Sequence, residues 1–424
     1  MSLTEIIPYA ATGLILARLG ADTALNLLNR RSVRAHASAV PEAFRATVDP
    51  QTYSKSVQYT LAKSKFGEIS DLWGTAAVLA VLFLGILPAT FVWFRSTFGV
   101  SAWTDAAWIF AIGVGLSVWS LPMDWWAQFR LEERFGFNTT TARLWWTDHV
   151  KGFVLVAVLG YPLLVLILKL VGWMGPSWWI WAWAIFIGFQ LMLLVVAPIL
   201  ILPLFNKLTP LPDGTLRDRL LALARRTGFS AKTLLVMDGS KRSRHSNAFF
   251  TGFGRFRKIV LFDTLIGQLH EPELEAVLAH EVGHYKRGHI PQRLAVSAIM
   301  TLAGFWIIAW LMQQSWFAGA FGFAPDAGLA PALLLFGLLG GTILFWVSPL
   351  SNCWSRRHEY EADAFARRTM GSAEPLVGAL RKLSEKNLSN LTPHPWFSAW
   401  HYSHPTLLER EAALAADRRP NAQA

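Results

Sequence analysis

The sequence predicts a mainly α-helical, polytopic membrane protein, and three observations lead to that fold class. Of the 424 residues, 53% are hydrophobic and only 16% are charged, whereas soluble domains carry about 25% charged residues. Several apolar runs approach the length of about 20 residues with which a helix crosses a bilayer. Basic residues gather in alternate segments between these runs, as topology signals do. A fibrous, disordered or ordinary cytosolic protein is therefore excluded.

Seven apolar runs are expected to be membrane spans. They cover residues 6–28, 72–94, 106–122, 153–171, 178–202, 291–312 and 329–350. The first run is the weakest, because Arg18 and Asp22 lie inside it. A charge at membrane depth usually faces a water-filled interior or a partner. The alternative for these two side chains is a local pair, since they stand one helical turn apart.

The segments between the spans alternate between basic and nearly uncharged. Segments 29–71, 123–152, 206–290 and the tail after residue 350 are rich in Lys and Arg, whereas the loop near 95–105 has only Arg95, and 172–177 and 313–328 have none. Basic loops stay cytoplasmic, so the N-terminus is expected outside and the C-terminus inside, in agreement with seven crossings. The net charge of +11 is thus explained by topology, and nucleic acid is not an expected partner.

The chain is expected to divide into four parts. Residues 1–205 form a membrane domain with the first five spans, 206–290 a soluble domain, 291–350 the last two spans, and 351–424 a C-terminal cytoplasmic part. Within 206–290, strand-like runs at 233–237 and 258–262 alternate with helical patterns at 216–227 and 272–286. The polar stretch 415–424 is expected to be irregular.

The soluble domain contains the strongest chemical signal, an H-E-x-x-H motif at His280, Glu281 and His284. The motif falls on a predicted helix that has Pro272 in its first turn. Positions i and i+4 share one helix face, so both imidazoles can hold one metal ion, with Glu281 placed as general base. The single cysteine, Cys353, excludes a cysteine-based site. The alternative is two histidines on an ordinary amphipathic helix.

A hydrolytic zinc site needs a third protein ligand, and candidates follow the last span. Glu359 and Asp363 stand four residues apart, so they share a helix face. One of them can bind the metal while the other accepts a ring N–H from a ligand histidine. His358 competes as a ligand, but it points about 100° away from Glu359 on the helix.

Together these residues resemble the type I CAAX prenyl endopeptidases, which are integral-membrane zinc metalloproteases with a zincin-like domain. The resemblance extends over nearly the whole chain, through H-E-V-G-H at 280–284, S-R-R-H-E-Y-E-A-D-A-F-A at 355–366, and stretches within 49–66, 132–138, 203–212, 239–248 and 401–405. The tail lacks an endoplasmic reticulum retrieval signal and the loops are short, so a bacterial member in the inner (plasma) membrane is expected.

The resemblance implies a fold and a set of roles. The fold is seven helices that enclose a water-filled chamber capped by the protease domain. One Zn²⁺ per chain would be held by His280, His284 and Glu359, with Asp363 behind them. Asn247 would hold the substrate backbone, and His404, as an imidazolium, would stabilise the tetrahedral intermediate. His289, His394 and His401 are expected to be structural or to line the substrate groove.

The expected function is a zinc-dependent membrane endopeptidase in which Glu281 is the general base. Its partners would be the lipid bilayer and a peptide or protein substrate, which in this family is prenylated at a C-terminal Cys and loses its C-terminal tripeptide. One alternative is a membrane-protein quality-control metalloprotease that acts on unprenylated substrates. Another is a transporter or lipid-binding protein with a vestigial metal site, against which the intact set of ligands argues.

Overall fold

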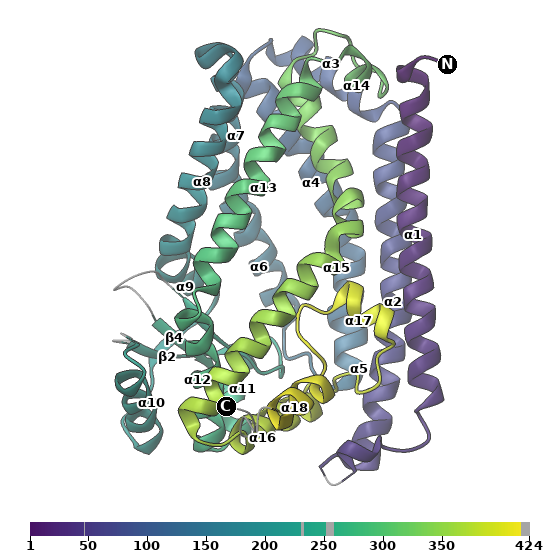
Figure 1. The fold of residues 1–424 in the computed structure, drawn as a ribbon. Coiled ribbons are helices and arrows are strands. Elements are labelled where there is room, and N and C mark those ends of the chain that lie inside the picture. The colour runs from purple at the N-terminus through teal and green to yellow at the C-terminus, as the bar shows by residue number, and fades with distance from the viewer. Residues whose placement is uncertain (46, 230–232, 252–257, 417–424) are drawn as a thin grey trace, which may run out of the picture.

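The computed structural model describes residues 1–45, 47–229, 233–251 and 258–416. Long helices run through most of the height of the molecule, and shorter helices and a sheet gather at its lower end (Figure 1). The long helices are α1 (Leu3–Ala35), α2 (Pro50–Phe83), α3 (Ile86–Phe98), α4 (Ala102–Trp126), α6 (Ala142–Leu155), α7 (Tyr161–Met174), α8 (Trp178–Val196), α13 (His289–Met312) and α15 (Leu329–Met370). Short helices α5 (Glu133–Phe135), α9 (Leu202–Phe205) and α14 (Ser315–Gly319) join them.

Capping residues set where several of these helices begin. The Asp49 carboxylate accepts hydrogen bonds from the backbone N–H groups of Gln51 and Thr52, and Pro50 is the first residue of α2. This arrangement satisfies donors that have no partner within the helix. The hydroxyls of Ser101 and Thr141 cap α4 and α6 in the same way.

The mainly helical membrane fold is confirmed, but the count of seven spans is not. Five continuous helical stretches of the described chain are long and apolar enough to cross a membrane: Pro50–Phe83, Ala102–Phe135, Ala142–Phe205, His289–Met312 and Leu329–Met370. The third stretch turns back on itself at Gly175–Ser177, and its two legs α7 and α8 pack against each other. Helix α1 is not among the five, and it carries the charges that weakened the first predicted span.

One predicted span is wrong in detail, and an open question about another is answered. The run 72–94 is not one helix, because α2 ends at Phe83 and Gly85, with φ +73°, starts α3 in a new direction. Only glycine adopts such a φ readily. The alternative of a local ion pair between Arg18 and Asp22 is not formed in the described residues. Asp22 instead lies 3.2 Å from Nε2 of His401, and both charges line a cavity of about 250 Å³ between α1, α2 and α15.

The soluble end is a four-stranded sheet covered by helices. Its strands are β1 (Leu208–Pro210), β2 (Thr233–Met237), β3 (Ala248–Thr251) and β4 (Lys258–Phe262), in the order β1-β2-β4-β3. Strands β2 and β4 are parallel and the outer pairings are antiparallel, so β3 is an edge strand. The helices are α10 (Thr215–Arg226), α11 (Asp263–Gln268), α12 (Glu271–Lys286), α16 (Glu374–Lys386), α17 (Pro395–His401) and α18 (Leu407–Ala416).

The strand-like and helical patterns of the soluble domain therefore match β2, β4, α10 and α12. At the tail, α18 continues through Ala415 and Ala416, so these two residues are not irregular, and 417–424 lie outside the described residues. The hydrophobic core of this domain packs α10, α12 and α16 against the sheet, around side chains such as Leu220, Ile259 and Leu278.

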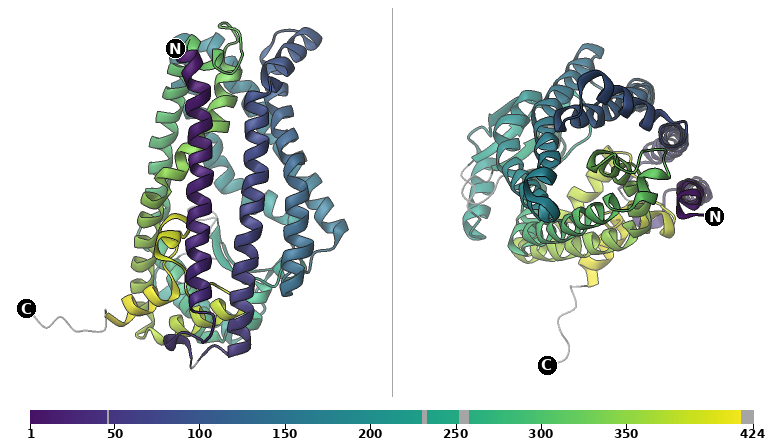
Figure 2. Two further views of the ribbon diagram at one scale, coloured as in Figure 1. Left: turned by 90° about the vertical axis from the view of Figure 1, so that its right-hand side faces the viewer. Right: turned by 90° about the horizontal axis from the view of Figure 1, so that it is seen from above.

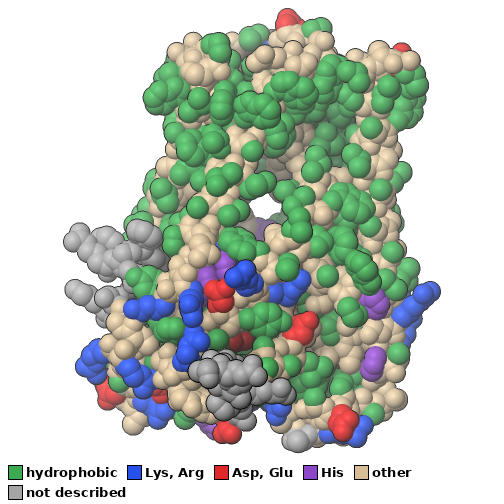
Figure 3. Space-filling model, viewed as in Figure 1, with side chains coloured by type: hydrophobic (Ala, Val, Ile, Leu, Met, Phe, Trp, Pro, Cys, Tyr) green, Lys and Arg blue, Asp and Glu red, His purple; other side chains and the backbone are tan. Residues whose placement is uncertain are grey.

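The surface divides into two zones. Hydrophobic side chains cover the upper part, while Lys, Arg, Asp and Glu gather at the lower end (Figure 3). An opening between α13 and α15 hollows the same face, directly above the histidines and the charged residues (Figures 1 and 3). From above, the long helices stand around the periphery of the molecule (Figure 2). The soluble end thus lies directly below this opening.

Candidate active site

The H-E-x-x-H motif lies on α12. The backbone N–H of His270 donates to the Glu273 carboxylate at 2.7 Å and closes the first turn of the helix. Leu274, Leu278 and Val282 form the buried face of α12, which leaves His280 and His284 one turn apart beside α15. Helix α15 continues without a break from the last predicted span to Glu359 and Asp363. The membrane helix itself therefore brings these two carboxylates to the site.

His280, His284 and Glu359 converge on one point. The Nε2 atoms of the two histidines are 3.2 Å apart, and the Glu359 oxygens lie 3.5 Å from Nε2 of His280 and 3.3 Å from Nε2 of His284. All three ligand atoms fall within 4.8 Å of one another. Oε2 of Glu359 is buried without a hydrogen-bond partner in the described residues. Two imidazole nitrogens and a carboxylate are a donor set for zinc, and the unsatisfied oxygen fits a site for a cation.

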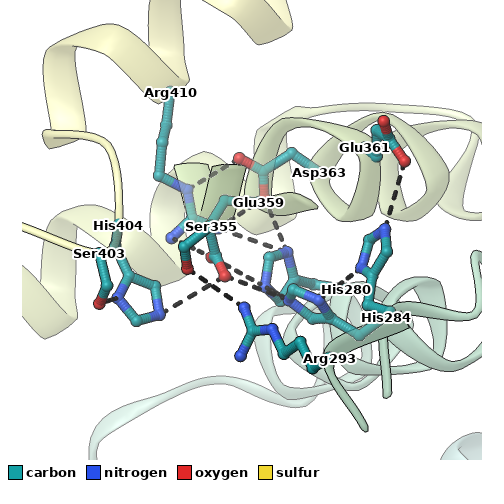
Figure 4. Close-up of polar contacts among 11 residues, drawn as sticks. His280, His284, Arg293, Ser355, Glu359, Glu361, Asp363, Ser403, His404 and Arg410 are labelled. Carbon is teal, nitrogen blue, oxygen red and sulfur yellow. Dashed lines mark hydrogen bonds and ion pairs between the residues drawn. The ribbon is translucent and has the colours of Figure 1, made fainter. Parts of the chain in front are cut away.

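A buried ion pair orients His280 (Figure 4). Its Nδ1–H donates to Oδ1 of Asp363 at 2.8 Å, and Arg410 holds both oxygens of Asp363, at 2.8 and 2.5 Å. This bond leaves Nε2 of His280 facing Glu359 and His284. Burial alone would lower the pKa of His280, but the hydrogen bonds to Asp363 and Glu359 outweigh it and raise that pKa to about 9.

His284 is oriented by a chain that sequence reasoning missed. A hydrogen bond of 2.8 Å joins its Nδ1 to Nδ1 of His289, and Nε2 of His289 lies 3.2 Å from Glu361. His358, the competing ligand candidate, instead stacks on His289 with ring centroids 3.9 Å apart. Gly288, with φ +70°, separates α12 from α13 and directs His289 back to the site. Arg410 was also missed, because nothing in its local sequence marks it.

Glu281 is half-buried beside the two histidines, and among the described residues no hydrogen bond or ion pair engages its carboxylate. Burial raises the pKa of Glu281, partly against the attraction of His280 and His284. A carboxylate whose pKa is shifted toward neutrality can both take up and release a proton. Its position and its proton affinity therefore suit a general base.

His404 reaches the site from the segment between α17 and α18. Its Nε2 lies 3.5 Å from Oε1 of Glu359, and its Nδ1 is hydrogen-bonded to the Ser403 hydroxyl at 3.0 Å. Partial loss of hydration lowers the pKa of His404, against the attraction of Glu359. The lowered pKa favours the neutral imidazole over the imidazolium, and either form can donate a hydrogen bond.

Asn247 directly precedes the edge strand β3, which packs against α12. Its backbone carbonyl accepts a hydrogen bond from Phe262 of β4 at 3.2 Å. In the described residues no hydrogen bond joins Asn247 to His280 or His284. An edge strand offers unpaired backbone groups to an extended peptide, so Asn247 stands where a substrate backbone could be held.

Residues of the membrane domain contact the loop before Asn247. His245 lies 3.3 Å from Glu132 and 3.0 Å from the Asn387 side chain, and Glu132 also accepts a hydrogen bond from the Tyr59 hydroxyl at 2.7 Å. Phe137 stacks on the His245 ring with centroids 4.0 Å apart. The edge strand is thus tied to α2 and to the turn after α4.

Comparison with known proteins agrees with this architecture. The family model described as CAAX prenyl protease N-terminal, five membrane helices, matches residues 29–207, and the model of peptidase family M48 matches residues 210–418. CAAX prenyl protease 1 of Saccharomyces cerevisiae is 34% identical over 88% of both chains. The Arabidopsis thaliana homolog is 36% identical over 88% of this chain and 90% of its own, and the Homo sapiens homolog is 32% identical over 88% of each.

Among solved structures, the chain resembles the crystal structure of S. mikatae Ste24p, with a TM-score of 0.88 and 31% identity. The match covers 98% of this chain and 99% of the other. The likeness therefore includes the membrane helices as well as the soluble end.

Proposed function

The chain belongs to peptidase family M48 and includes that family's CAAX prenyl protease N-terminal region, and on this premise we propose that it is a zinc-dependent endopeptidase of CAAX proteins. It is an integral, multi-pass membrane protein and a metallopeptidase. The observation that carries the proposal is the convergence of His280, His284 and Glu359 below the opening between α13 and α15. The proposed substrate is a membrane-bound protein that ends in a prenylated CAAX sequence.

In the proposed mechanism His280, His284 and Glu359 hold the metal, and Asp363 fixes His280 with Nε2 toward it. Zinc, when bound there, supplies Lewis-acid polarisation of a carbonyl and lowers the pKa of water. Glu281 takes the proton of the attacking water and returns it to the leaving amine. Asn247 and the free edge of β3 hold the substrate backbone, and the Nε2–H of His404 donates to the oxyanion of the tetrahedral intermediate.

The proposed topology follows from charge. The end of the molecule with the metal site is rich in Lys and Arg (Figure 3), which favours the cytoplasmic side. We therefore propose an external N-terminus and a cytoplasmic C-terminus, in the inner membrane if the protein is bacterial. We also keep the division into 1–205, 206–290, 291–350 and 351–424 as a proposal, with α15 joining the last two parts.

Two matched peptides that end in a CAAX sequence, one farnesylated and one not, test the function. Purified zinc-loaded protein is incubated with each peptide and the products are identified by mass spectrometry. Cleavage of the farnesylated peptide between the cysteine and the next residue is the expected result. Equal cleavage of both peptides, or degradation of an unfolded protein with neither peptide cut, would favour the quality-control alternative.

Glu281→Gln tests the mechanism in the same assay. We expect kcat to fall by about 10²–10⁴-fold, the usual contribution of a general base, while the zinc content stays at one ion per chain because Glu281 is not a ligand. Glu271→Gln, on the same helix but outside the site, should keep full activity. Substantial turnover by Glu281→Gln, or loss of its zinc, would contradict the assigned role.

A further inference from the structure

A cavity of about 920 Å³ adjoins the metal site on the side of α1, α2 and α16. Its lining includes His404 and Arg410 from the site, His245 from the loop before β3, and Lys63 from α2. The volume is that of a pocket for a drug-sized ligand. Three extended residues span about 10 Å, so a short piece of peptide next to the scissile bond fits this space.

The lining of this cavity is basic. It contains no Asp or Glu among the described residues. Four of its five basic side chains form an ion pair with a carboxylate: Arg410 with Asp363, His245 with Glu132, His401 with Asp22 and His404 with Glu359. Lys63 is attracted by Glu132 without a direct ion pair to it. Lys63 has no ion pair in the part of the chain that the structure describes, and its Nζ lies 5.1 Å from the centroid of the Tyr59 ring. The cavity therefore offers an ammonium group to an anionic ligand.

The edge strand gives the direction in which a peptide would enter the cavity. His245, which lines the cavity, precedes Asn247 and β3 in the chain. A peptide paired with the free edge of β3 thus meets the cavity at the N-terminal end of that strand. If the peptide runs antiparallel to β3, its C-terminal residues are the ones that enter.

We propose that Lys63 binds the C-terminal α-carboxylate of the substrate and so selects peptides that end a few residues beyond the scissile bond. The proposal rests on the proposed function, because a CAAX sequence is by definition C-terminal. It identifies this cavity as the site for the released tripeptide. The ammonium of Lys63 donates to the carboxylate, and the antiparallel run along β3 places the scissile carbonyl at the metal site.

Two farnesylated CAAX peptides that differ only at the C-terminus, a free acid and a primary amide, test the carboxylate site. The wild-type enzyme should cleave the acid with a kcat/KM about 10–100-fold higher than the amide, the range for one charge-assisted hydrogen bond. Lys63→Gln should lower kcat/KM for the acid to the level of the amide and leave the amide nearly unchanged. Lys65→Gln, an exposed lysine two residues along α2 that does not line the cavity, should keep the preference of the wild type.

Binding of the same peptides to zinc-loaded Glu281→Gln, with and without Lys63→Gln, separates this proposal from the proposed function. Tighter binding of the acid than of the amide, lost on Lys63→Gln, would support the carboxylate site. If the wild-type enzyme cleaved neither peptide, the proposed function would be refuted, but this binding result would still support the carboxylate site. Equal binding and cleavage of acid and amide, or a preference that survives Lys63→Gln, would overturn the carboxylate site and leave the endopeptidase activity standing.

Discussion

The residues proposed to hold the metal and the residues proposed to meet the substrate are built in opposite ways. The metal-holding region lies on two long helices, α12 and α15, and its Glu359 side chain is 3% exposed. His280, Glu359 and Asp363 are all buried there, and each is fixed by a charged or aromatic neighbour. The substrate-facing region consists of an edge strand and the segment between α17 and α18, where the His404 side chain is 65% exposed.

The difference follows from what each region must do. A metal ion accepts ligands only within a narrow range of distance and direction, so its ligands need rigid elements and bound partners. A peptide must enter, pair with β3 and leave, which requires backbone and side chains that are accessible. Substitutions should therefore separate into those that reduce turnover with the metal retained and those that reduce metal binding.

Among substitutions that distinguish the two regions, the largest effect is expected in the substrate-facing region. His404→Ala should lower kcat by about 10²–10³-fold, the loss typical of one oxyanion donor, because its Nε2–H no longer reaches the developing charge. Zinc content and thermal stability should stay as in the wild type, since the side chain is largely exposed. Loss of zinc from this variant, measured by elemental analysis, would show that the two regions are not separable at His404.

In the metal-holding region we expect a smaller effect, on zinc affinity rather than on kcat. Asp363→Asn should lower zinc affinity by about 10–100-fold, because it weakens the bond that orients His280 and breaks the pair with Arg410. Competition with a chelator measures the affinity, and excess zinc should restore much of the activity.

Glu361→Gln is the matched variant for Asp363→Asn, since Glu361 acts on His284 only through His289 and is about one-third exposed. Its effect on zinc affinity should be smaller than that of Asp363→Asn. An equal effect would mean that burial does not decide how strongly these carboxylates support the site.

The sequence could predict the metal-holding region better than the substrate-facing one, and the reason is the helix period. The spacing of His280 with His284, and of Glu359 with Asp363, is a property of single helices and needs no tertiary information. Asn247 and His404 lie in segments without periodicity, so only resemblance to a family could mark them. The structure places His404 at Glu359, whereas the role of Asn247 stays a prediction.

The features that the sequence did not predict share a cause: local sequence does not indicate which residues will become tertiary partners. Asp22 lies one turn from Arg18, yet its partner is His401, at the other end of the chain. Arg410 looks like any charge on a short terminal helix until α18 packs against α15. The break at Gly85 was missed because the hydrophobic run 72–94 continues through it, and hydropathy does not register a change of backbone direction.

The smallest expected effect concerns the contact between α12 and α15. A Cβ on Gly283 would lie 3.0 Å from the Cα and O atoms of Ala362 and 3.1 Å from Cβ of Phe365. Backbone atoms cannot move aside as a side-chain tip can, so Gly283→Ala should destabilise the protein by about 1–2 kcal/mol, as overpacking does. The same displacement would move the α12 histidines away from Glu359 and lower zinc affinity in parallel with stability.

Gly337→Ala is the control for this contact, because it adds the same methyl group to α15 with nothing within 4 Å of the new Cβ. It should leave thermal unfolding in detergent unchanged or slightly raised, since alanine favours the helix. If both variants unfold alike, the close approach of α12 to α15 does not limit stability, and the rigidity of the metal-holding region must come from the Asp363–Arg410 pair instead. If Gly283→Ala alone lowers both stability and zinc affinity, the packing of α12 on α15 sets the geometry of the metal ligands. The substrate-facing region has no such packing of two helices to fix its side chains.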